Sequence, residues 1–206
     1  MFKFFKKGND NLNEEKRFKS VLSKDKEGNT IVAFYKLKRP FNEILIRKDE
    51  FTNRKILAFK TSAGLASNKI FTYAFEGSIK IDIGFMFDDN KIYLLLGTYL
   101  KDLEIKVGDT FQYLFQDGTV ESLTVTEKSY QKRRGRYGIE IENKIEISEG
   151  TLNKFCSTMT KKWKFTVHKN GVEIFGGRNA FEKDYEIQVE VFELANCFRI
   201  ALNNVN

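Results

Sequence analysis

The chain has 206 residues, a length that suits one large β domain or two small ones. Hydrophobic residues make up 41% of it and include 20 Phe and 8 Tyr, while a single Pro argues against Pro-rich linkers. The 35 basic and 28 acidic residues leave a net charge of +7, which permits binding to nucleic acid or an anionic surface but is most simply explained by solubility.

Cysteine usage and hydropathy bear on the compartment. Cys156 and Cys197 are too few for a disulfide framework, which favours a reducing environment. No apolar run approaches the roughly 20 residues of a membrane span, and the N-terminal MFKFFKK is too short for a secretory signal. We expect a bacterial-type cytoplasmic protein with a flexible segment at 1–18 and a single β-rich domain at 19–206, with a possible subdivision near 62–69.

Alternating apolar residues predict most strands of the first half. They cover 29–38, 41–48, 55–61 and 70–75, and Pro40 separates the first two because it lacks the amide proton that a ladder needs. Segments 79–87 and 91–97 form a hairpin around the turn at 88–90. The continuous apolar run at 92–96 is typical of a strand buried on both faces.

The clearest β pattern lies between residues 108 and 147. Asp117-Gly118 between two apolar runs predicts a hairpin, because Gly adopts positive φ at little cost. Isoleucines alternate over 139–147, and we expect Asn143 and Lys144 to shift the register of that alternation. We predict that the three strands of this stretch form an antiparallel meander. The solvated face of its last strand is expected to carry Glu140, Glu142 and Glu146.

The period changes after residue 147. Ser148 is a predicted N-cap, and Leu152, Phe155, Cys156 and Met159 then fall on one helical face. Segments 163–167 and 172–175 return to period two around a turn at 169–171 and predict a third hairpin. The last segment fits both a strand and a helix. The helical pattern covers more residues, so we choose a helix over 184–203.

Residues with catalytic or metal-binding potential are sparse. His168 is the only histidine, which excludes sites that need two imidazoles. Asp82, Asp88 and Asp89 resemble a solvated turn more than a cation site, and no glycine-rich phosphate loop is present. We assign no catalytic residue, metal or cofactor, and we expect a non-enzymatic interaction or structural domain with an unidentified protein partner.

A basic stretch at 128–137 is the sharpest candidate for binding. Its candidate residues are Tyr130, Lys132, Arg133, Arg134, Arg136 and Tyr137. Cations beside aromatic rings at a hairpin tip can grip a phosphate backbone and stack on bases. The simpler interpretation is a solvated tip whose charge resists edge-to-edge aggregation. Binding of nucleic acid or an anionic surface is therefore the alternative function.

A pattern in the C-terminal half resembles uncharacterised bacterial β-rich proteins. It runs from Val107-Gly108-Asp109 through Phe115 and Asp117-Gly118-Thr119, and continues from Ile147 to Lys164 with Trp163. In those proteins such a hairpin precedes a short helix and a further hairpin, so the resemblance implies a fold habit and no activity. The expected fold is mainly β, an antiparallel sandwich or strongly bent sheet of about ten strands with a short helix and a C-terminal helix. The alternative is a pleckstrin-homology-like barrel capped by the last helix.

Overall fold

The computed structural model describes residues 18–34, 43–61, 64–65, 70–74, 79–99, 101–133, 139–178 and 184–205. The first half contains β1 (Ser20–Lys24), β2 (Thr30–Phe34), β3 (Glu43–Lys48), β4 (Lys55–Thr61), β5 (Gly64–Leu65), β6 (Ile70–Ala74), β7 (Lys80–Asp88) and β8 (Lys91–Tyr99). The second half contains β9 (Thr110–Phe115), β10 (Val120–Thr124), β11 (Tyr130–Arg133), β12 (Ile139–Ile147), β13 (Thr160–Thr166) and β14 (Glu173–Arg178). The helices are α2 (Glu149–Ser157) and α3 (Asp184–Leu202).

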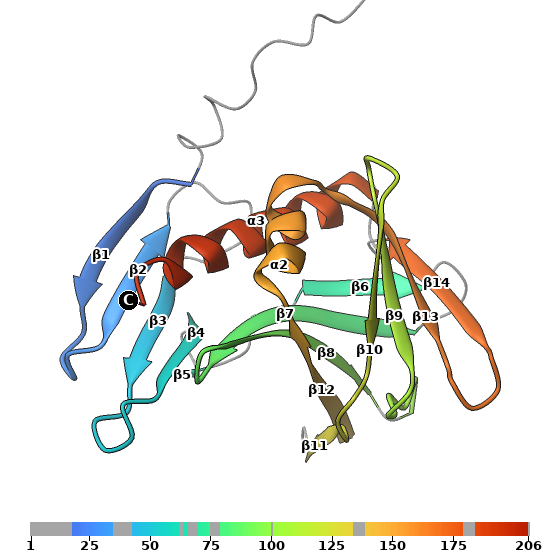
Figure 1. The fold of residues 1–206 in the computed structure, drawn as a ribbon, viewed down its shortest axis with the longest axis horizontal. Coiled ribbons are helices and arrows are strands. Elements are labelled where there is room, and N and C mark those ends of the chain that lie inside the picture. The colour runs from blue at the N-terminus through green and yellow to red at the C-terminus, as the bar shows by residue number, and fades with distance from the viewer. Residues whose placement is uncertain are drawn as a thin grey trace, which may run out of the picture.

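The strands form one antiparallel sheet with a branch (Figure 1). Its main path runs β1-β2-β3-β4-β7-β6-β14-β13-β9-β10, and β8, β12 and β11 branch from β7. The predicted antiparallel sandwich or strongly bent sheet with a short and a C-terminal helix is confirmed, although the described residues form fourteen strands where about ten were expected. The barrel alternative is wrong, because β1 and β10 end the path and do not pair.

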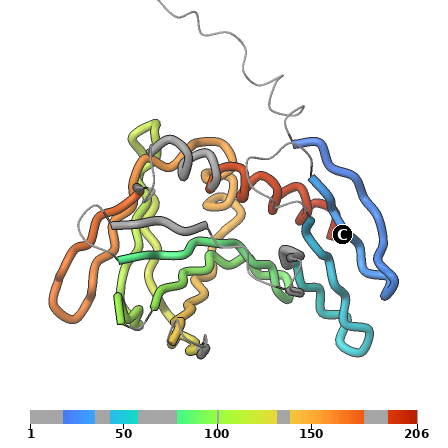
Figure 2. Tube along the Cα trace, turned by 180° about the vertical axis from the view of Figure 1, so that it is seen from behind, coloured from blue at the N-terminus to red at the C-terminus, as the bar shows by residue number. Residues whose placement is uncertain are grey.

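Strand β7 is where the sheet bends. One edge of β7 pairs with β8. The other edge is shared, since the ladder with β6 stops at Ile83 and the ladder with β4 starts at Phe87. Phe85 lies between these two ladders, and its ring packs on Phe155 of α2 at 5.5 Å and Phe198 of α3 at 5.7 Å. The two helices therefore fill the bend, and α3 crosses from one arm of the sheet to the other (Figures 1 and 2).

The local turn and cap signals are confirmed. Asp89 and Asn90 have φ of 49° and 65° and form the two-residue β7–β8 turn, the conformation that such hairpins favour. Gly118 in the β9–β10 turn has φ of 84°. The Ser148 Oγ accepts a hydrogen bond from the Thr151 amide at 3.0 Å and caps α2. Helix α3 spans the predicted segment.

The predicted meander is wrong. β12 pairs with β8 and β11, whereas β10 pairs with β9 alone and ends the sheet. The reason is burial: β8 holds Leu94, Leu95 and Leu96, all nearly inaccessible, and needs neighbours on both edges. β10 buries only Leu123, which suits an edge strand.

The predicted register shift in β12 is also wrong. β12 pairs with β8 in one continuous register, and Asn143 points inward, with its Nδ2 donating to the Glu127 carbonyl at 2.9 Å. Glu140, expected to be solvated, is buried, whereas Glu146 is exposed. A polar side chain with a backbone partner can thus occupy an inward position of a strand.

Several predictions fall at the margins of the described residues. β1 was not predicted, and β11 occupies Tyr130–Arg133 within the basic stretch expected to form a hairpin tip. Phe18 is buried and packs on Phe192 at 6.2 Å, while the rest of the predicted flexible segment, 1–17, lies outside the described residues. The same holds for 35–42 of the first predicted strand pair, and for 62, 63 and 66–69 of the possible subdivision.

Candidate functional site

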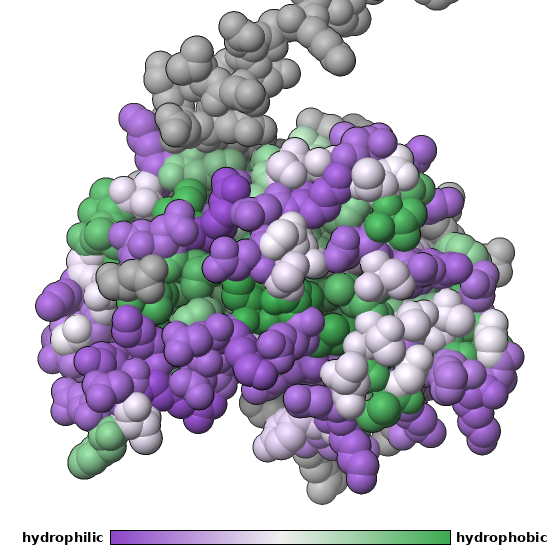
Figure 3. Space-filling view, in the orientation of Figure 1, coloured by the Kyte–Doolittle hydropathy of each residue, from purple (hydrophilic) through white to green (hydrophobic). Residues whose placement is uncertain are grey.

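A cleft of about 1030 Å³ opens among the described residues. It lies between the end of α3, the start of α2, the β7–β8 turn and the end of β12. On the face of the molecule seen in Figure 3, a band of apolar side chains runs between hydrophilic ones. A cleft with an apolar floor and a polar rim is the usual form of a binding site.

The floor is built by three neighbouring strands. Phe87 of β7 is the register partner of Ile92 of β8, which is in turn the partner of Ile147 of β12. Leu152, in the first turn of α2, and Leu202, at the end of α3, complete it. Because register partners on adjacent strands point to the same face of a sheet, the ladder itself creates this apolar row.

The rim contains a weak ion pair. Lys91 Nζ lies 2.8 Å from Glu146 Oε2 across the β8–β12 ladder, and both side chains are more than half exposed (54% and 56%). The hydrogen bond that Lys91 donates to the Glu146 carboxylate raises the pKa of Lys91. Exposed pairs of this kind contribute little to stability, so the rim can rearrange around a ligand at low cost.

Arg199 also lines the cleft and, unlike Lys91, has no carboxylate partner among the described residues. It is half-buried, and its Nη2 donates to Asn196 Oδ1 at 3.3 Å. The amide of Asn196 is itself fixed, since its Nδ2 donates to the carbonyls of Phe192 at 2.9 Å and Cys156 at 3.0 Å. In the part of the chain that the structure describes, no carboxylate forms an ion pair with Arg199. Its remaining guanidinium donors are therefore available to a carboxylate or phosphate.

The basic residues predicted from the sequence lie elsewhere. Tyr130 is 72% exposed on β11, Lys132 and Arg133 end that strand, and Arg134, Arg136 and Tyr137 lie outside the described residues. The β11–β12 register places Glu142 opposite Tyr130 and Glu140 opposite Lys132. The basic hairpin thus carries carboxylates in its own ladder, which reduces its net charge.

His168 lines a separate open hollow of about 370 Å³ together with Asp102, Glu104 and Asp109. The Asp109 carboxylate accepts hydrogen bonds from the backbone amides of His168 at 2.9 Å and Lys106 at 2.7 Å. Glu104 pairs with the Lys106 ammonium at 2.7 Å. These contacts join the 101–109 loop to the β13–β14 turn, so the carboxylates of Asp109 and Glu104 already have structural partners. No cluster of possible metal ligands occurs among the described residues.

The two thiols are buried between the helices. Burial raises the pKa of Cys156 to about 11, and it raises that of Cys197 further. With pKa values this high, both thiols are protonated at neutral pH. They are unreactive there, because the thiolate is the nucleophilic form. Both side chains contribute to the packing between the helices, and we assign them no reactive role.

The cleft was missed from the sequence because its walls come from segments that are far apart in the chain. Arg199 carried only the weak signal of a cation in the last turn of a helix. No helix in the described ranges is long and apolar enough to cross a membrane. Comparison of the whole chain with family models, with curated proteins and with solved structures gave no match, so its assignment depends on its own geometry.

Proposed function

We propose that the protein is a non-enzymatic interaction domain whose cleft receives a segment of a protein partner. The observation that carries the proposal is Arg199, a half-buried guanidinium beside an apolar floor and without a carboxylate partner among the described residues. Two free buried thiols suit a reducing cytoplasm, where we place the domain.

The cleft favours a particular kind of segment. The row of Phe87, Ile92 and Ile147 takes an apolar side chain, and Arg199 takes an acidic side chain next to it. A guanidinium binds a carboxylate through two parallel hydrogen bonds, which fixes orientation as well as adding affinity. The volume of about 1030 Å³ is at the upper end of the range for small-ligand pockets, which favours a peptide.

A displayed library of random peptides tests this function. Selection on the wild-type protein is expected to enrich peptides that combine a large apolar residue with Asp or Glu. Arg199→Gln removes the cation, and Asn153→Trp, at an exposed cleft position of α2, fills the space. Both should weaken the selected peptides at least tenfold. Asn170→Trp, on the distant β13–β14 turn, is the matched control and should leave binding unchanged.

Methyl NMR with an enriched peptide then locates the contact. Shifts are expected at Ile92, Ile147 and Leu152, which line the cleft. Enrichment of peptides that bind the Arg199→Gln and Asn153→Trp variants as well as the wild type would refute the proposal. So would a shift map confined to another face.

The second candidate is nucleic-acid binding through the basic hairpin, favoured by the 72% exposure of Tyr130 beside the cations of β11. A gel-shift assay at low salt should show binding that is lost when Lys132, Arg133, Arg134 and Arg136 are replaced by Ala. The control replaces four exposed lysines, Lys24, Lys26, Lys101 and Lys169, and changes the net charge equally, from +7 to +3. Equal loss in both variants would indicate a non-specific charge effect, and no binding at low salt would remove this candidate.

A further inference from the structure

Three segments along one edge of the molecule, away from the cleft, each carry an exposed apolar side chain. The β3–β4 turn, β11 and the β13–β14 turn all reach the lower edge in Figures 1 and 2. These segments carry Phe51, Tyr130 and Val172, which are 98%, 72% and 48% exposed. None of these three side chains lines the cleft.

The β3–β4 turn holds Phe51 outward in a fixed conformation. Asp49 Oδ1 accepts hydrogen bonds from the amides of Phe51 and Thr52, both at 2.9 Å, and these bonds lower the pKa of Asp49. Arg54, which ends the turn, is tied to Asp88 by two hydrogen bonds. Because the turn is already ordered, Phe51 can enter an apolar phase without a further entropy cost for the backbone.

Three cations, Arg47, Lys48 and Lys55, lie where β3 ends and β4 begins, at the base of the same turn. Lys48 lies directly opposite Lys55 in the β3–β4 ladder, and like charges in this position repel. The two lysines line a hollow of about 520 Å³, together with Glu27 and Glu50. Lys55 Nζ donates one hydrogen bond to the Val205 carbonyl at 2.6 Å, which leaves two donors. Arg47 and Lys48 form no ion pair within the described part of the chain. An anion between Lys48 and Lys55 would relieve their repulsion.

The other two segments repeat the combination of a cation and an exposed ring or methyl group. Lys128 is exposed two residues before Tyr130, and Lys169 is exposed in the turn that leads to Val172. Carboxylates are present at this edge as well, including the exposed Glu50. Insertion of apolar groups is therefore the main contribution, and the cations supplement it.

We propose that this edge docks on the surface of an anionic lipid bilayer, with Phe51 inserted at the interface and Lys48 and Lys55 contacting lipid phosphates. An energetically dominant residue of a protein interface lies within a continuous patch that excludes water. Here the apolar side chains project from separate segments, each beside a cation. That pattern matches the headgroup region, where apolar insertion and attraction to anionic lipids combine.

Vesicle co-sedimentation tests the proposal. The full chain is expected to partition weakly and reversibly onto vesicles of phosphatidylglycerol and phosphatidylcholine, and not onto phosphatidylcholine alone. Phe51→Ser should weaken partitioning about tenfold or more. Val120→Ser is the matched control, because Val120 is 57% exposed next to the β9–β10 turn at the opposite edge (Figure 1). Arg47→Gln with Lys48→Gln should reduce the salt dependence.

A tryptophan at the tip reports insertion directly. Trp163 is the only native tryptophan and is buried, so Phe51→Trp adds an exposed fluorophore. Its emission should shift to the blue on anionic vesicles and be quenched by brominated lipid, whereas that of Val120→Trp should not. Unchanged thermal melts should show that the variants fold.

Three results would overturn the proposal. The first is no partitioning of the wild type at low salt and millimolar lipid. The second is partitioning that Phe51→Ser leaves unchanged. The third is Phe51-dependent self-association, or binding to duplex DNA, without vesicle binding, which would assign this edge to another macromolecule.

Discussion

Arg54 and Asp88 form a two-point ion pair that ties the β3–β4 turn to the end of β7. Arg54 Nε lies 2.5 Å from Asp88 Oδ1, and Nη2 lies 2.5 Å from Oδ2. The Asp88 side chain is only 9% exposed, whereas that of Arg54 is 49% exposed. The backbone adds a second link, since the Asp89 amide donates to the Lys55 carbonyl at 3.3 Å. Two turns that are 34 residues apart in the chain are thus fixed to each other.

This ion pair predicts a loss of stability in acid. The hydrogen bond from Arg54, followed by its charge, lowers the pKa of Asp88 below 3.8. A depressed folded-state pKa gives stability that is present above 3.8 and lost as the pH falls through the folded value. Asp88→Asn should lower the melting temperature at pH 7. It should also reduce the difference in melting temperature between pH 7 and pH 3. Asp89→Asn, on the same turn, is the control. A pH dependence identical to wild type in Asp88→Asn would contradict the assignment.

The contact between α2 and the sheet predicts a large core effect. Phe155 is 1% exposed and packs on Phe85, Tyr113 and Phe115 at centroid distances of 5.5, 4.8 and 5.3 Å. Phe155→Ala should lower the free energy of unfolding by about 3–5 kcal/mol, because it leaves a cavity in a packed core. Ser157→Ala, on the exposed face of the same helix, should change it by less than about 0.5 kcal/mol. Urea denaturation measures both, and similar values would show that α2 does not anchor the core.

Substitutions at two glycines distinguish the cost of backbone strain from the cost of a steric clash. Gly108 and Gly118 have φ of 93° and 84°, but a Cβ at Gly108 would lie 3.0 Å from the His168 ring, whereas one at Gly118 would meet no atom within 4 Å. Gly118→Ala should cost about 1 kcal/mol from the positive φ alone, and Gly108→Ala should cost more. His168→Ala should restore part of the extra loss in the Gly108→Ala background. Equal costs at the two positions would exclude the contact.

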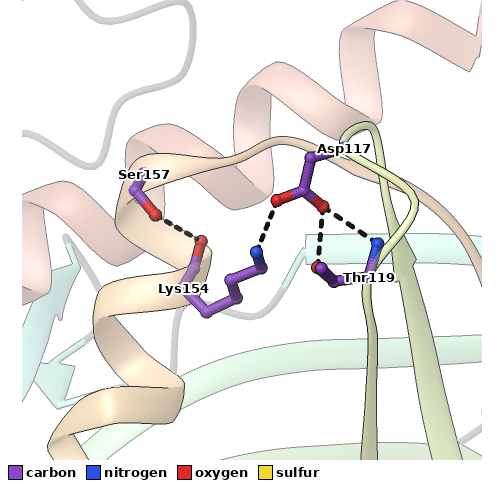
Figure 4. Close-up of polar contacts among 4 residues, drawn as sticks. All are labelled: Asp117, Thr119, Lys154 and Ser157. Atoms are coloured by element: carbon purple, nitrogen blue, oxygen red, sulfur yellow. Dashed lines mark hydrogen bonds and ion pairs between the residues drawn. The ribbon is translucent and has the colours of Figure 1, made fainter.

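The β9–β10 turn is linked to α2 by a carboxylate that should titrate anomalously (Figure 4). Asp117 accepts hydrogen bonds from the Lys154 ammonium at 2.5 Å, and from the Thr119 hydroxyl and amide at 2.7 and 3.0 Å. Together they lower its pKa to about 2, with Lys154 the largest cause. NMR titration should find this value, and Lys154→Met should move it towards 3.8. Stability from this contact is present above pH 3.8 and disappears as the pH falls through about 2. A pKa unaffected by Lys154→Met would refute the link.

Part of the fold and little of the candidate site were predictable from the sequence. The run at 92–96 correctly indicated a strand buried on both faces, and such a strand needs two neighbours. That requirement indicates that β8 has a second neighbouring strand besides β7, but it does not identify β12. Pairing between strands more than 40 residues apart has no local sequence signal. The cleft could not be predicted for the same reason. Arg199 lines one cleft with Ile92 and Leu152 only because α3 packs on the sheet.

The sequence by itself determined the features whose causes lie within a few residues. These are the positive-φ turns at Asp89-Asn90 and Gly118, the Ser148 cap and the helical period of α3. Tertiary structure decided that β12 joins β8, that β10 ends the sheet, and that Phe51 projects from a turn fixed by Asp88. The physical reason is that turns and caps depend on the φ and hydrogen bonds of adjacent residues. Strand order depends instead on which distant apolar faces bury one another.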